Sequence, residues 1–277
     1  MSNKILIKNA RIINEGTSLI KDILIEGLII SKIDTEINVL SSVNIINAEG
    51  LTLIPGMIDD QVHFREPGLT HKGDIFSESR AAVAGGVTSF IEMPNTIPNT
   101  TNNSALNEKI EIAKSKSFAN FSFMFGGTNY NLDDILSVDD NNIAGIKLFL
   151  GSSTGNMLID NHKVIEEIFR NTKLPISVHC EDEYIIKKNL INYINKYGDD
   201  IPIDLHPEIR NEEACYKSSK FAIELAKKTD ARLNVFHIST AKELDLFDNK
   251  LPLRQKKITS EACAHHLWFT DKDYKLL

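Results

Sequence analysis

Residues 174–179 read Leu-Pro-Ile-Ser-Val-His, a short apolar run that ends in an imidazole. Residues 56–63 and 233–237 have the same form, and residues 144–150 are an apolar run with a lysine inside it. Runs of this length are typical of strands buried in a parallel sheet. The polar residues they carry are His63, Lys147, His179 and His237. Because the carboxyl ends of parallel barrel strands meet at one face, the pattern predicts a metal site there.

From Pro55-Gly56 onward, apolar runs alternate with helical segments, which predicts a parallel sheet with crossover helices. The clearest helix is expected at about 208–228, with Pro207 suited to its first turn. Barrel strands are expected near 57–63, 87–93, 120–126, 144–149, 174–179, 232–237 and 257–261. These features predict an α/β protein with a TIM-like (β/α) barrel that lacks the eighth strand of a complete one.

Residues 1–54 have a different pattern, with short strands and tight turns between them. Asn9, Glu15-Gly16 and Glu26-Gly27 are expected to separate strands at 5–7, 11–13, 22–25 and 28–30. The predicted domains are therefore a small N-terminal β-sheet module, residues 1–54, and a C-terminally incomplete barrel, residues 55–277.

The composition excludes several classes of protein. A net charge of −7 without a basic run argues against nucleic acid as a partner. No apolar stretch approaches the roughly 18 residues of a membrane span, so no membrane partner is expected. Three widely spaced cysteines indicate reduced thiols, which favours a cytoplasmic protein.

Lys147 points to a particular kind of metal site. An amine buried on a strand tends to lose its proton, and a neutral amine can react with carbon dioxide to give a carbamate. The two carbamate oxygens could bridge two cations, with His179 and His237 completing one ligand shell and His63 in the other. Taken singly, each histidine is more often a partly buried polar residue, and a lone strand lysine more often extends to water. The combination and its flanking sequences favour the metal site.

The flanking sequences resemble a known family. Residues 55–68 (Pro-Gly-Met-Ile-Asp-Asp-Gln-Val-His-Phe-Arg-Glu-Pro-Gly) resemble the first-strand signature of the dihydroorotases in the amidohydrolase superfamily. Residues 92–96 are similar to their second-strand motif, and residues 145–149 to the strand that carries a carboxylated lysine. Residues 260–267 resemble their seventh-strand segment. The resemblance extends from about residue 1 to the last residue.

This resemblance implies that Lys147, His179 and His237 hold one zinc ion and that His63 contributes to a second, so one or two ions are expected. It also implies that Arg65 and Asn95 bind the carboxylate of the substrate. A guanidinium suits a carboxylate because its two-pronged donor geometry matches the two oxygens. For Asn95, turn chemistry beside the neighbouring prolines is an equally good interpretation.

The chain departs from the family pattern at two places. Gln61 stands where the family has its first histidine, and a neutral amide is a poor zinc ligand. The family also has a metal-binding aspartate on strand eight, which serves as general base and acid, and no counterpart occurs before Leu277. No catalytic residue is therefore assigned, and we expect a truncated or split product that needs a complementing segment for activity.

The leading prediction is a metal-dependent cyclic amide hydrolase of the dihydroorotase type, which interconverts dihydroorotate and N-carbamoyl-aspartate in pyrimidine biosynthesis. Another cyclic amidohydrolase (hydantoinase, dihydropyrimidinase or allantoinase) is the closest alternative. The alternative from a different class is a non-catalytic partner of aspartate carbamoyltransferase, which Gln61 favours and the retained Lys147, His179 and His237 oppose. A homodimer is also expected. His206 is interpreted as solvated and Cys180 as a packing residue, whereas His265 and His266 either line the pocket mouth or pack.

Overall fold

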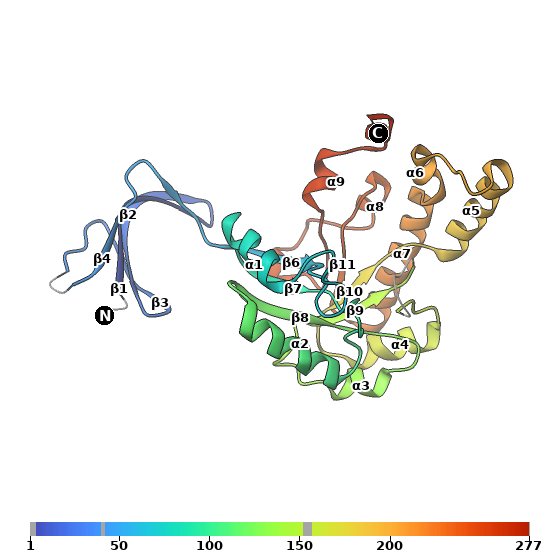
Figure 1. Ribbon diagram of the computed structural model, residues 1–277, viewed down its shortest axis with the longest axis horizontal. Coiled ribbons are helices and arrows are strands. Elements are labelled where there is room, and N and C mark those ends of the chain that lie inside the picture. The colour runs from blue at the N-terminus through green and yellow to red at the C-terminus, as the bar shows by residue number, and fades with distance from the viewer. Residues whose placement is uncertain (1–3, 40–41, 152–156, 277) are drawn as a thin grey trace. The chain divides into compact units, whose positions relative to one another are not determined.

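Two compact units, Met1–Met57 and Ile58–Leu277, divide the chain in this computed structural model. Figure 1 shows the order of their elements along the chain. The structure describes residues 4–39, 42–151 and 157–276. No helix among these residues is long and apolar enough to cross a membrane.

The first unit is a mixed sheet in the order β3-β2-β1-β4, with β5 also paired to β1. Its strands are β1 (Lys4–Asn14), β2 (Thr17–Glu26), β3 (Ile29–Asp34), β4 (Asn44–Asn47) and β5 (Thr52–Leu53). The prediction that Asn9 ends a strand is wrong, because β1 continues through it with a register shift between Ile7 and Ala10. Asn9 takes a left-handed φ of 60° and its N–H donates to the buried Asp22 at 2.9 Å. Asparagine tolerates this conformation, so the residue forms a bulge within the strand rather than a turn.

The second unit contains a seven-stranded sheet in the order β12-β11-β10-β9-β8-β7-β6. Its strands are β6 (Met57–Val62), β7 (Val87–Glu92), β8 (Asn120–Gly126), β9 (Gly145–Phe149), β10 (Ile176–His179), β11 (Leu233–Val235) and β12 (Ile258–Ser260). Neighbours from β7 to β12 pair in parallel. The predicted seven-stranded (β/α) barrel is therefore confirmed.

Helices connect these strands, and most begin at an Asp or Asn cap. They are α1 (Ile75–Ala84), α2 (Asn103–Lys116), α3 (Leu132–Ser137), α4 (His162–Asn171), α5 (Glu183–Tyr197), α6 (His206–Ile209), α7 (Glu212–Thr229), α8 (Ala241–Leu244) and α9 (Ala264–Trp268). The single helix expected at 208–228 is in fact two. Asn211 accepts a hydrogen bond from the Ala214 N–H at 3.1 Å and so starts α7 anew. Pro207 lies in the first turn of α6 instead.

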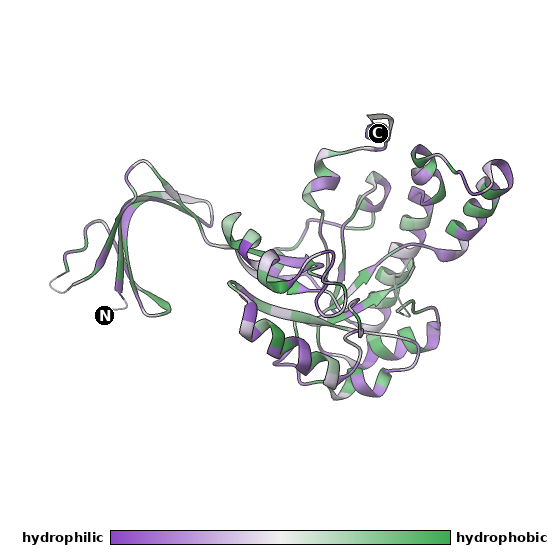
Figure 2. Cartoon of the chain, in the orientation of Figure 1, coloured by the Kyte–Doolittle hydropathy of each residue, from purple (hydrophilic) through white to green (hydrophobic). Residues whose placement is uncertain are grey.

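The barrel strands supply the core of this unit. Every residue of β9 is buried, and Ile146 and Leu148 are fully so. Figure 2 shows hydrophobic colouring on these central strands, whereas the surrounding helices carry both colours. Burying a charged side chain in such a strand costs free energy unless the charge is paired or hydrogen-bonded, which makes Lys147 on β9 conspicuous.

We expect Leu148→Ala to lower the free energy of unfolding by about 2–5 kcal/mol, because it leaves a cavity in a fully buried strand. Leu136→Ala on α3 is the matched control, since Leu136 is 48% exposed and its truncation leaves no internal cavity. Denaturant unfolding measures both values. Equal losses in the two variants would contradict the assignment of β9 to the core.

Candidate metal centre

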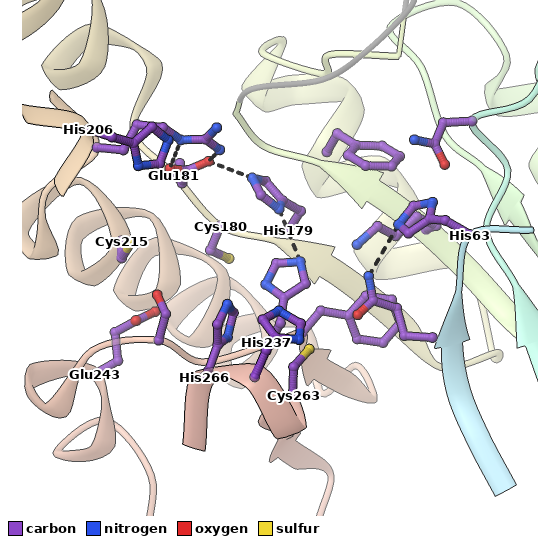
Figure 3. A pocket seen from close by; sticks show the side chains of 18 of the residues that line it. His63, His179, Cys180, Glu181, His206, Cys215, His237, Glu243, Cys263 and His266 are labelled. Atoms are coloured by element: carbon purple, nitrogen blue, oxygen red, sulfur yellow. Dashed lines mark hydrogen bonds and ion pairs between the residues drawn. The ribbon is translucent and has the colours of Figure 1, made fainter. Parts of the chain in front are cut away.

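A cavity of about 580 Å³ opens at the carboxyl ends of the barrel strands. The structure brings all six residues of the predicted site to its walls: His63, Arg65, Asn95, Lys147, His179 and His237. They come from five different strands or the residues that directly follow them. Figure 3 shows His179 and His237 side by side, with His63 across the cavity from them.

Lys147 is the deepest of these side chains, with 1% of its surface exposed. Its Nζ lies 4.1 Å from the ring centre of Phe236 and 4.8 Å from that of Phe149. Within the described parts of the chain, no group forms a hydrogen bond with this Nζ. Burial lowers the pKa of Lys147 to about 7, which leaves a large neutral fraction at neutral pH.

His179 and His237 direct nitrogen atoms at each other. The Nδ1 of His179 lies 3.1 Å from the Nε2 of His237. Burial, followed by the charge of Lys147, lowers the pKa of His237 to about 3. Burial likewise lowers the pKa of His179. Both imidazoles are therefore neutral at neutral pH, the form in which histidine binds metal ions.

His63 has different neighbours across the cavity. Its Nε2 lies 3.4 Å from the Nε2 of the Gln61 amide, and Asn95 forms a hydrogen bond with the same ring. Burial, then the charge of Arg65, lowers the pKa of His63 to about 3. Gln61 thus lies at the cavity wall beside His63. Its amide is the neighbouring group that could contact an ion bound by His63.

A buried ion pair lies close to Arg65 at the end of β7. Glu92, at the end of β7, pairs with Lys109 of α2, and Lys109 also donates to the Met93 carbonyl at 2.7 Å. Burial raises the pKa of Glu92, and the charges of Lys109 and Arg65 offset part of this rise. Arg65 has a left-handed φ of 69°, and non-glycine residues in this region concentrate at functional sites.

Sequence reasoning missed several side chains that line this cavity, among them Glu181, Arg210 and Glu243. His206 is exposed, as expected of a solvated histidine, although it also lies at the wall of this cavity. Glu181 lies two residues after His179 and bonds its ring, so a His-x-Glu spacing at a strand end is the signal that was available. Arg210 could not be found this way, since it is 29 residues from its partner Glu181.

The donor set fits a divalent metal ion at Lys147, His179 and His237. Two neutral imidazole nitrogens converge there, and a buried amine without a hydrogen-bond partner among the described residues is the group that a carbamate would replace. Cys263, His265 and His266 form another group at the cavity wall, with ligand atoms within 4.8 Å of one another. His265 and His266 line this cavity, and lining the pocket mouth is one of the two roles considered for them.

Comparison with known proteins supports this fold. A dihydroorotase of Methanosarcina acetivorans is 32% identical over 98% of this chain and 59% of its own length. An allantoinase of Solibacter usitatus is 30% identical over 97% of this chain and 59% of its own. The solved L-hydantoinase (dihydropyrimidinase) of Arthrobacter aurescens has a TM-score of 0.90 at 25% identity, covering 100% of this chain and 61% of that one. No protein-family model matches the chain.

The chain is thus similar in sequence to proteins named dihydroorotase and allantoinase and in fold to an L-hydantoinase. Among these relatives, proteins named dihydroorotase match it at 32% identity over 98% of its length. The chain spans about three fifths of the length of the curated relatives it matches.

Lys147→Met should stabilise the metal-free protein at about pH 6, and this advantage should shrink as the pH rises toward 10. The folded-state pKa of about 7 lies below the ordinary 10.5, so the unfolded chain binds the extra proton between these values. Wild-type stability should then gain about 1.4 kcal/mol per pH unit in this range relative to the variant. Urea unfolding in chelator-treated, carbon-dioxide-free buffer measures the difference. A difference that does not change with pH would contradict the burial of a titrating amine.

Proposed function

We propose that the protein is a metal-dependent hydrolase of cyclic amides whose substrate carries a carboxylate, as dihydroorotate does. The observation that carries this proposal is the convergence of Lys147, His179 and His237 with Arg65 and Asn95 on one cavity. The relatives named dihydroorotase support the particular substrate. In the reverse direction, the same site would close carbamoyl-aspartate into the ring.

His179, His237 and the carbamate form of Lys147 would hold one zinc ion. A bound ion of this kind supplies the activation of water and the polarisation of an amide carbonyl at neutral pH. The protein's own contribution is twofold. It keeps both imidazoles neutral, and it buries the Lys147 amine, so that the amine would react with carbon dioxide rather than with a proton. His63 with Gln61 offers a weaker second position, because a neutral amide binds zinc less well than imidazole.

Arg65 and Asn95 would orient the substrate. A guanidinium at one wall of the cavity can bind both oxygens of a carboxylate and so fix which ring carbonyl faces Lys147, His179 and His237. The relatives named allantoinase and hydantoinase make an uncharged ring the alternative substrate. Arg65 favours the acidic ring over this alternative, because a cation in a partly buried site gains most from an anionic partner.

A second candidate function is that of a non-catalytic partner of aspartate carbamoyltransferase. Gln61 favours it, because this residue replaces a histidine that the family uses as a ligand. The convergence of Lys147, His179 and His237 opposes it, since a scaffold has no chemical reason to bury an amine beside two imidazoles. A scaffold would bind little zinc.

We expect Lys147→Ala to reduce the zinc content to a small fraction of the wild-type value, with partial recovery when a short carboxylic acid is added to replace the carbamate. The reason is that the carbamate would be the anionic ligand of this site. Metal analysis after dialysis measures the content, and Lys109→Met, at another buried lysine, is the control for general loss of structure. Wild-type zinc content in Lys147→Ala would remove the carbamate from the proposal.

Arg65→Met should weaken the turnover of dihydroorotate much more than that of hydantoin, because only the first substrate offers a carboxylate to the guanidinium. Loss of a charged hydrogen-bonding partner is expected to cost about 2–5 kcal/mol, or roughly 30-fold or more in kcat/KM. Side-by-side assays of dihydroorotate, hydantoin and allantoin measure it. An equal loss for charged and uncharged rings would show that Arg65 does not bind the carboxylate.

A further inference from the structure

The two ring nitrogens of His179 face different partners. Its Nε2 lies 2.7 Å from Oε2 of Glu181, and its Nδ1 lies 3.1 Å from Nε2 of His237. Figure 3 shows both contacts as dashed lines that leave opposite sides of the ring. A neutral imidazole has one N–H and one lone pair, so these two contacts decide which nitrogen can bind an ion.

Glu181 determines where the proton of His179 lies. An ionised carboxylate only accepts hydrogen bonds, so the Nε2 of His179 has to be the donor in the 2.7 Å contact. The guanidinium of Arg210 contacts both carboxylate oxygens of Glu181, a geometry that fits the ionised carboxylate. The Nδ1 of His179 therefore presents its lone pair toward His237.

Arg210 fixes the position of this carboxylate. Its Nε donates to Oε1 of Glu181 at 2.7 Å, and its Nη2 donates to Oε2. Such a two-pronged contact restrains both the position and the plane of the carboxylate. The backbone on the other side is also close, because a Cβ on Gly151 would lie 2.2 Å from the Glu181 carbonyl oxygen. Glu181 is 5% exposed and has little room to move.

The arrangement also determines the state of His237. The 3.1 Å contact needs one donor, and the Nδ1 of His179 is an acceptor. In the metal-free protein the Nε2 of His237 therefore carries the proton. An ion placed between the two rings requires a lone pair from each, so the proton of His237 has to move from Nε2 to Nδ1, while that of His179 stays.

We propose that Glu181, clamped by Arg210, is a positioning residue that fixes His179 in the Nε2–H form and aims its Nδ1 lone pair at the metal ion, so that only His237 changes its protonated nitrogen when the ion binds. The proposal rests on the proposed function only in placing an ion between these two rings. Each ring keeps one proton throughout, so neither imidazole releases a proton when the ion binds.

Nitrogen-15 histidine spectra of the metal-free and zinc-loaded protein test the two tautomers directly. His179→Asn and His237→Asn spectra assign the two rings. We expect the Nε2–H form of His179 in both states, and a change from Nε2–H to Nδ1–H for His237 on loading. A His179 ring in the Nδ1–H form in the metal-free protein would overturn the proposal, whatever the protein hydrolyses.

Glu181→Gln supplies the second readout. Its amide oxygen can still accept from His179, but its NH₂ group repels Arg210, so the clamp is lost. We expect a mixture of His179 tautomers and a zinc dissociation constant about 10- to 100-fold higher than that of the wild type. Arg210→Met should shift both quantities in the same direction. The titrations use a Cys263→Ser background with a competing chelator, because Cys263, His265 and His266 could bind zinc themselves.

Glu243→Gln is the matched control. Glu243 is a carboxylate 3% exposed at the wall of the same cavity, but it accepts from the hydroxyls of Ser219 and Thr240 rather than from a histidine. This variant should leave the tautomers and the zinc affinity unchanged. A Glu181→Gln variant that lowers only the stability would leave the tautomers and the zinc affinity as they are in the control. That outcome would show that Glu181 is purely structural and would overturn the proposal. If the wild type bound no zinc, the proposed function would fail, and the metal-free spectra would still decide the tautomer.

Discussion

The buried amine of Lys147 is the constraint on which the site depends. It lies on β9, in the middle of the sheet, and among the described residues it has no carboxylate partner and no hydrogen bond. Burying an unpaired ammonium costs several kcal/mol, and the nearby faces of Phe149 and Phe236 offset only part of that cost. The amine is therefore held close to neutrality. The same burial keeps His179 and His237 neutral. Burial in the cavity therefore favours the neutral form of all three side chains.

Parallel strand geometry brings these donors together. Lys147 pairs in register with Ser177, so His179, two residues further along β10, points to the same face one step closer to the carboxyl edge. His237 lies just beyond β11 and has a left-handed φ of 42°. Such a conformation costs about 1–3 kcal/mol and persists only where surrounding contacts impose it. Strand register thus places His179, and a strained turn places His237.

The barrel, the three histidines and Lys147 could be predicted from the sequence because each of these residues ends an apolar run or lies inside one, whereas Arg65 and Asn95 depended on the resemblance of the flanking sequences. The bulge at Asn9 and the break before α7 could not, since asparagine is compatible with a turn, a bulge and a helix cap alike. Glu181 and Arg210 join two connections that no local pattern relates. Their pairing follows from a tertiary contact between the residue after α6 and the connection after β10, which a single sequence does not encode locally.

The two sides of the cavity offer a metal ion donors of different strength. This difference decides which side should bind an ion more tightly. On one side, two neutral imidazoles face each other at 3.1 Å beside a reactive amine, and one of them is supported by a carboxylate–guanidinium pair. On the other, the Gln61 amide lies 3.4 Å from His63. An amide supplies no negative charge and is a weak ligand for zinc. Ion affinity should therefore be concentrated at Lys147, His179 and His237, which leaves His63 to contact the substrate or a weakly held second ion.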